Sequence, residues 1–151
     1  MYHWMVKKRL EKSFKALNNG RYDVITRQFH KTKATHWFSG NHPLSGLRTK
    51  HSDILLWYKR LSILMPDLSF NIKKIRVKGL PFKTTAYIHW TDSLTDKEGR
   101  RYHNKGMHII TIKWGKVVGL EVYCDTLYLN NYIEALVKQG IKEATLAPIE
   151  S

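Results

Sequence analysis

The sequence contains very little cysteine and none of the spacings typical of metal sites. Cys124 is the one cysteine among 151 residues, so no disulfide can form within the chain. The eight histidines form no HExxH pair, and no CxxC pair accompanies them, which argues against a zinc site. A P-loop, a dinucleotide-binding fingerprint and a Ser-His-Asp order are also missing. We therefore expect neither a metal nor a bound cofactor.

Long apolar runs are absent as well. No stretch approaches the roughly 20 apolar residues that a membrane-spanning helix needs. The first ten residues are interrupted by Lys7, Lys8 and Arg9, so they lack the apolar segment of a secretory signal. Together with the single cysteine, these absences predict a protein of the reducing cytoplasm without a membrane partner.

Acidic residues are scarce. The chain has 12 Asp and Glu against 26 Lys and Arg, which gives a formal net charge of +14. Such a charge attracts nucleic acid, an anionic membrane surface or an anionic small ligand. The basic residues are spread from Lys7 to Lys142, with a dense cluster at 73–78. We therefore favour a basic solvated surface that steers small anions, and we keep nucleic-acid binding as the weaker alternative.

Apolar residues recur first at helical spacing and later at strand spacing. The predicted helices are 3–18, 22–29, a third one capped by Ser52 or Asp53 and broken at Pro66, and 127–138. The predicted strands are 34–38, 68–78, 84–91, 101–114 and 117–124. Residues 39–46 are expected to form a loop, and the tail through Pro148 to be loose.

This order of elements predicts the α+β class. We expect a curved antiparallel sheet, wrapped around the N-terminal helices, to form a cone with an internal pocket. A C-terminal helix completes the fold, and residues 1–151 are expected to form one domain.

Strand alternation predicts which side chains reach the pocket. The inner face of strand 101–114 is expected to carry Asn104 and His108, and that of the last strand Val118, Leu120, Val122 and Cys124. The outer face is expected to carry Met107, Ile109, Val117 and Tyr123, which is enough apolar surface to predict a two-fold homodimer.

Four local patterns point to a known family: residues 14–20, the Gly-x-x-Pro-x-x-Gly loop at 40–46, Asn104-Lys105-Gly106, and residues 122–126. In order and spacing they resemble the SnoaL-like branch of the nuclear transport factor two superfamily. That superfamily includes polyketide cyclases, ketosteroid isomerases, epoxide hydrolases, dehydratases and proteins that only bind, so the resemblance implies a pocket and leaves the reaction open.

The resemblance also shows which catalytic groups are missing. The base of ketosteroid isomerases matches Trp37, and their oxyanion-hole tyrosine matches Phe14. The acids of epoxide hydrolases match Val122 and the segment His89–Thr91. Neither reaction is expected by its usual route, because the carboxylates that would move protons are absent from these positions.

We predict a small-molecule-binding domain whose ligand is hydrophobic or weakly anionic, used as an isomerase, cyclase or dehydratase or as a non-catalytic binding or interaction module. The candidate catalytic residues are His108, Asp125 and His89. The candidate ligand-binding residues are Trp37, Phe38, His42, Tyr58, Asn104, Leu120 and Val122.

Each candidate also has a structural interpretation. The unperturbed pKa of a histidine lies near neutral pH, which would suit His108 to proton transfer. His108 could equally be a hydrogen-bonded core residue. Asp125 could cap the last helix. His89 faces outward by alternation, although the family resemblance turns it inward. The aromatic residues could simply pack in the core, and Cys124 is expected to be a buried, inert thiol.

Overall fold

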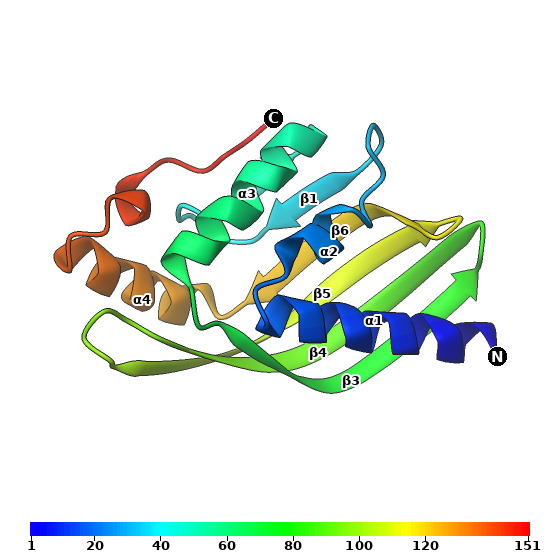
Figure 1. Ribbon diagram of the computed structural model, residues 1–151, viewed down its shortest axis with the longest axis horizontal. Coiled ribbons are helices and arrows are strands. Elements are labelled where there is room, and N and C mark those ends of the chain that lie inside the picture. Colours follow the sequence, from blue (N-terminus) through cyan, green and yellow to red (C-terminus); the bar gives the residue numbers. More distant parts are fainter.

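The computed structural model describes all residues from 1 to 151 (Figure 1). Its helices are α1 (Tyr2–Asn18), α2 (Tyr22–Thr26), α3 (His51–Leu64), α4 (Thr126–Lys138) and the 3-10 turn η1 (Lys142–Thr145). Its strands are β1 (Thr35–Phe38), β2 (Gly46–Arg48), β3 (Ser69–Leu80), β4 (Lys83–Thr95), β5 (Arg101–Lys113) and β6 (Lys116–Cys124). No helix is long and apolar enough to cross a membrane.

The six strands form one sheet in the order β2-β1-β6-β5-β4-β3. The sheet curves, and α1, α2 and α3 lie on its concave side (Figure 1), which confirms the predicted α+β cone. One detail was wrong: β1 runs parallel to β6, with Thr35 opposite Gly119 and Phe38 opposite Val122, so the sheet is mixed. The three-residue strand β2 was not predicted, because so short a segment shows no alternation; only its first residue, Gly46, fell in the predicted loop 39–46.

A register shift between Thr111 and Ile112 changes the predicted faces of two residues. Ile110 lies opposite Leu120, but Ile112 lies opposite Val117, so a bulge reverses the alternation at the start of β6. Val117 is therefore buried in the core rather than on the outer face. The prediction for Val117, and for Val118 on the inner face, was wrong for this reason.

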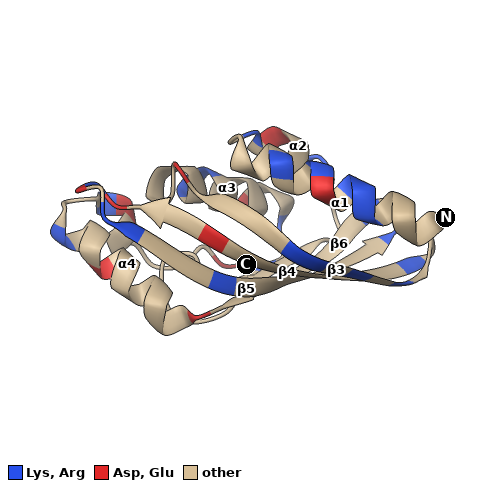
Figure 2. Ribbon diagram, turned by 90° about the horizontal axis from the view of Figure 1, so that it is seen from below, with Lys and Arg blue, Asp and Glu red and all other residues tan.

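A single cluster of 32 buried apolar residues fills the space between the sheet and the helices. On β4 the inner face is made by Ala86, Ile88 and Trp90, all buried. His108 and Ile110 occupy the same face of β5, as the alternation predicted. Lys and Arg are distributed over several elements rather than in one patch (Figure 2).

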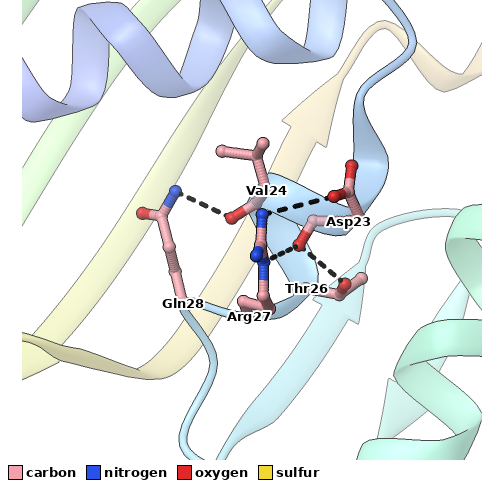
Figure 3. Close-up of polar contacts among 5 residues, drawn as sticks. All are labelled: Asp23, Val24, Thr26, Arg27 and Gln28. Atoms are coloured by element: carbon pink, nitrogen blue, oxygen red, sulfur yellow. Dashed lines mark hydrogen bonds and ion pairs between the residues drawn. The ribbon is translucent and has the colours of Figure 1, made fainter.

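The helix α2 is shorter than predicted because the chain leaves it to pair with β6. The amide of Val117 donates to the carbonyl of Gln28, and the amide of His30 donates to the carbonyl of Val117, both at 2.8 Å. The last turn is held by an ion pair between Arg27 and Asp23 at 3.2 Å (Figure 3).

The tail through Pro148 was expected to be loose, and this was wrong: it forms η1, and Arg60 donates to the carbonyl of Ala147 at 2.7 Å. The last residue is fixed as well. The amide of Ser151 donates to the carbonyl of Leu47 at 3.0 Å, and the Ser151 hydroxyl accepts from the amides of Thr49 and Lys50. These bonds satisfy amides just before α3, whose N-cap is Lys50. Neither Ser52 nor Asp53 caps the helix, because both already lie within its first turn.

Candidate functional site

The main cavity lies between the concave sheet, α1 and α3, and has a volume of ≈ 50 Å³. Thirteen of its 16 lining residues are hydrophobic, and the other three are Asp92, Asn104 and His108. Pockets that hold drug-sized ligands measure roughly 300–1,000 Å³. The cavity as it stands therefore fits a small apolar molecule, and a larger one requires the walls to move apart.

A second cavity of ≈ 40 Å³ lies towards α1 and α2. It shares Leu17, Tyr58, His108 and Leu120 with the main cavity. Its polar lining adds Ser13 and Gln28, whose side chains hydrogen-bond each other at 3.0 Å. The Gln28 amide also donates to the carbonyl of Val24, which fixes its position after α2 (Figure 3).

His108 sits between the two cavities and is 8% exposed. The indole Nε1 of Trp90 donates to Nδ1 of His108 at 2.8 Å. Because an indole only donates, Nδ1 is unprotonated and the proton of the neutral ring resides on Nε2. Burial lowers the pKa of His108 to about 3. The ring is therefore a neutral hydrogen-bond donor at pH 7, and this arrangement works against the predicted role of His108 as a base.

Gly106 makes room for the indole that fixes His108. It lies opposite Trp90 across the β4–β5 pair. A Cβ at Gly106 would come within 2.2 Å of the carbonyl oxygen of Tyr123 and within 2.6 Å of the Trp90 ring. Real Cβ atoms do not make such contacts, so only glycine allows the ring to cross β5 at this point.

Asp92 is the carboxylate of the main cavity, and the sequence interpretation missed it. It lies opposite Asn104, whose backbone amide donates to Asp92 Oδ1 at 3.0 Å. No salt bridge holds Asp92. Burial raises its pKa to about 6, and the Asn104 hydrogen bond and the charge of His103 only partly oppose this.

The reason for the omission is the predicted end of the strand. The strand was placed at 84–91, whereas β4 continues to Thr95. Extending the alternation of Ala86, Ile88 and Trp90 by one step puts Asp92 on the inner face. The alternation could have identified Asp92, but only if the strand was predicted to continue through the polar residues after Trp90.

Two other predicted polar residues connect β5 to α4. Asp125 is exposed, and its carboxylate accepts from the amide of Tyr128 at 3.1 Å as the N-cap of α4. The Asn104 side chain donates to the carbonyl of Asp125 and accepts from its amide. Asn104 does line the cavity, but its amide group is already engaged. Asp125 matches its structural interpretation, since capping occupies its carboxylate.

His89 and Trp37 point away from the cavity. His89 is exposed between the buried Ile88 and Trp90, so the hydrophobic alternation was the correct guide and the inward placement was wrong. Trp37 likewise alternates with inward-facing neighbours on β1 and packs against Tyr123 on the outer face, with ring centroids 5.0 Å apart.

His42 is held within its own loop instead of reaching the cavity. Its Nε2 donates to the carbonyl of Ser39 at 2.8 Å, and its Nδ1 accepts from the amide of Leu44 at 3.2 Å. Both ring nitrogens are therefore occupied. The remaining predicted ligand-binding residues, Phe38, Tyr58, Leu120 and Val122, all lie in the cavity lining.

Two lining groups differ in their freedom to bind a ligand. The Tyr58 hydroxyl makes no hydrogen bond within the chain, and burial raises its pKa. The Cys124 thiol is also part of the lining, and burial raises its pKa to about 12. The thiol therefore stays protonated and inert, while the hydroxyl and His108 Nε2–H are donors without a partner in the chain.

A fully buried arginine was not anticipated. Arg48 Nε donates to Nδ1 of His36 at 3.1 Å, and its other nitrogens donate to the carbonyls of Ser45, Gly46 and Ile149. This network ties the tail to β1 and β2, and it has no carboxylate partner. Elsewhere, no group of three or more His, Cys, Asp or Glu side chains could hold a metal ion.

Comparison with known proteins gives the following matches. A model of the SnoaL-like domain matches residues 10–120. TerC, co-crystallised with polyporic acid, is similar with a TM-score of 0.69 and 16% identity, covering 84% of this chain and 96% of that one. An NTF2-like protein of unknown function from Burkholderia pseudomallei is similar with a TM-score of 0.73 and 12% identity, covering 83% of this chain and 95% of that one. PrhC from Penicillium brasilianum is similar with a TM-score of 0.66 and 12% identity, covering 86% of this chain and 87% of that one.

At these identities the similar structures show the fold alone. No curated protein matches the chain in sequence.

Proposed function

The chain belongs to the SnoaL-like domain family, and from that premise we propose that its cavity binds a small apolar molecule and moves a proton on it through Asp92. One observation carries the proposal. Asp92 is the one carboxylate in a mostly apolar lining, and its pKa is raised to about 6. A base with a pKa near the working pH is ionised enough to act and basic enough to be effective.

The chemistry proposed is proton abstraction next to a carbonyl. The Asp92 carboxylate takes a proton from the carbon, and the electron pair of the broken C–H bond moves onto the carbonyl oxygen. The negative oxygen accepts hydrogen bonds from His108 Nε2–H and the Tyr58 hydroxyl, the two unpartnered donors of the lining. Asp92 then returns the proton to the same carbon or to a conjugated one, so the net change is exchange or isomerisation.

The proposed ligand is hydrophobic or weakly anionic. The apolar lining supports the first property, and the net charge of +14 would draw an anionic molecule towards the protein. TerC was co-crystallised with polyporic acid, which supports a small organic acid as the kind of molecule that this fold can hold.

The test uses 2-tetralone, an apolar ketone, in D2O. Because 2-tetralone is larger than the cavity of ≈ 50 Å³, its binding requires the walls to move apart. Binding is followed by the NMR shifts of the Leu120 and Val122 methyl groups, and exchange by the loss of the ketone's α-proton signal. We expect wild type to bind and to exchange. Asp92→Asn should bind similarly but exchange about 10²–10⁴-fold more slowly.

Asp125→Asn is the matched control, because asparagine also caps helices and the substitution removes only the exposed carboxylate. It should exchange like wild type. Binding without exchange in wild type would favour the non-catalytic module instead. If 2-tetralone and related cyclic ketones neither bind nor exchange, the proposal fails.

We further propose that residues 1–151 act as one domain and pair as a two-fold homodimer through the outer face of the sheet. Met107, Ile109, Tyr123 and Trp37 lie close together on that face, on neighbouring strands, and surround Glu121, which lies opposite both Ile109 and Trp37. Burial of these four apolar side chains against a second copy supports the pairing, because such a patch is unfavourable in water.

A further inference from the structure

One end of the molecule carries a group of exposed apolar side chains away from both cavities. Trp4 and Met5 lie on the first turn of α1, Leu80 is the last residue of β3, Phe82 lies in the β3–β4 turn, and Trp114 lies in the β5–β6 turn. They are between 55% and 76% exposed. We name these five residues the apolar tip. In Figure 1 the two turns and the N-terminus lie together at the right-hand end.

Hydrogen bonds hold the three segments of the apolar tip together. Nε2 of His3 donates to the carbonyl of Gly79 at 2.8 Å, which joins α1 to the β3–β4 turn. The amide of Trp114 donates to the carbonyl of Pro81, also at 2.8 Å, which joins the two turns. The apolar tip is therefore one fixed surface built from three distant parts of the sequence.

Trp114 occupies an unfavourable backbone conformation. It is the one non-glycine residue with a positive φ, 48°, and it is followed by Gly115 at 81°. Glycine or asparagine is preferred at such a position, and a bulky residue is strained there. Trp114 is also 76% exposed, so packing of its side chain offsets little of the strain. A strained residue whose side chain is largely exposed points to a role outside the fold.

The charge around the apolar tip is mostly positive. Segments 1–10, 78–83 and 113–116 contain three, two and two Lys or Arg respectively and no Asp or Glu, while Lys8 pairs with Glu11 on the next turn of α1 at 3.3 Å. In Figure 2 the strand ends beside the N-terminus are blue without red. Aromatic and apolar side chains surrounded by lysines match the boundary of an anionic lipid bilayer, where rings enter the headgroup region and cations meet phosphates.

We propose that the apolar tip attaches the protein peripherally to an anionic membrane surface. The proposed attachment is to the bilayer surface and needs no spanning segment. It revises the expectation of no membrane partner, which rested on the lack of long apolar runs, of a secretory segment and of further cysteines. A single-stranded nucleic acid fits less well, because it needs a groove that stacks successive bases. Here the side chains protrude from separate turns, and none of them lines an internal cavity.

The experiment is co-sedimentation of the protein with vesicles of phosphatidylcholine alone or mixed with phosphatidylglycerol. Wild type should bind the mixed vesicles and not the neutral ones. Trp114→Asn suits the positive φ and should leave the fold intact or slightly more stable. It should weaken binding about tenfold, because it removes a large apolar group from the interface. Phe82→Ser should act in the same direction.

Leu127→Asn is the control, because Leu127 is 73% exposed on α4 at the opposite end of the molecule. It should bind like wild type, and melting temperatures should show that all variants are folded. Failure of wild type to bind phosphatidylglycerol vesicles overturns the proposal. So does binding that Trp114→Asn and Phe82→Ser leave unchanged, which would mean charge attraction alone. Tighter binding to an oligothymidine, lost in Trp114→Asn, would assign the tip to nucleic acid instead.

Discussion

At the scale of single residues, burial shifts the pKa values of two cavity side chains in opposite directions. The pKa of Asp92 is raised to about 6, and that of His108 is lowered to about 3. Both shifts favour the neutral form of the side chain, because an apolar lining solvates charge poorly. The consequence is a site with an acid that can ionise near neutrality and an imidazole that stays neutral, and each makes stability depend on pH.

Replacing Asp92 should stabilise the protein at high pH. Because its folded pKa of about 6 exceeds the unfolded value of 3.8, the folded state binds more protons between these values. Stability therefore falls as pH rises through this window. The free-energy cost of ionising Asp92 in the folded state is fully present above about pH 6. We expect Asp92→Asn to raise the free energy of unfolding by about 1–3 kcal/mol at pH 8. Urea unfolding should show this gain shrinking towards pH 5, and a pH-independent difference would contradict it.

Replacing His108 should reduce acid sensitivity. Its folded pKa lies below the unfolded 6.5, so the unfolded state binds more protons between about pH 6.5 and 3. The neutral His108 ring therefore contributes its full share of the free energy of unfolding above pH 6.5. This contribution is lost as pH falls, at up to about 1.4 kcal/mol per pH unit. His108→Gln can still accept from Trp90 and does not titrate. Its unfolding free energy should decline less steeply below pH 6.5 than that of wild type, and equal slopes would argue against a buried neutral imidazole.

The sequence allowed some of these residues to be placed and not others. Alternation put His108 and Leu120 on the inner face because both lie in regular parts of long strands. It failed for Val117, where a bulge reverses the order. Asp92 was lost at a strand end, and Trp37 was assigned to the cavity although its neighbours His36 and Phe38 are the buried ones. Hydrogen bonds such as that from Trp90 to His108 depend on tertiary contacts, which no local pattern encodes.

At the scale of elements, the β4–β5–β6 region positions the site. β4 pairs with β5 without a register shift, and β5 pairs regularly with β6 apart from the bulge after Thr111, so the strands hold Trp90, His108 and Asp92 on one rigid surface. Their existence was predictable from alternation and turn residues. The parallel pairing of β1 with β6 was not, because a four-residue strand contains no information about its partner.

Gly106→Ala should disturb this region. Its Cβ would collide with the Tyr123 carbonyl and the Trp90 ring, so the strand or the indole must shift. We expect the free energy of unfolding to fall by about 2–4 kcal/mol, with altered tryptophan fluorescence. Gly119→Ala is the control, because its nearest contacts of 3.6–3.7 Å are ordinary. Similar losses in both variants would show that the close packing at Gly106 is not the cause.

At the scale of the whole molecule, the curved α+β cone was predictable, since it follows from the order of helices and strands. The two apolar surfaces of the molecule were not predictable from the sequence. The outer face of the sheet and the apolar tip each collect residues from distant segments, so their apolar character emerges only after folding.

The proposed dimer can be tested at this scale. Sedimentation velocity at micromolar concentration should show wild type as a dimer. Ile109→Lys, in the centre of the outer face, should be a monomer, because a buried unpaired charge opposes association. Leu127→Lys places the same charge on α4 and should remain dimeric. A monomeric wild type would remove the proposal of a homodimer.

Proton transfer by Asp92 inside the cavity is tested most directly by the pH dependence of exchange. The rate of deuterium exchange into 2-tetralone should rise with pH through a midpoint near 6, the folded pKa of Asp92. Asp92→Asn should lose this protein-dependent rate and Asp125→Asn should keep it. A protein-dependent rate that survives in Asp92→Asn, or one without a midpoint near pH 6, would contradict the account.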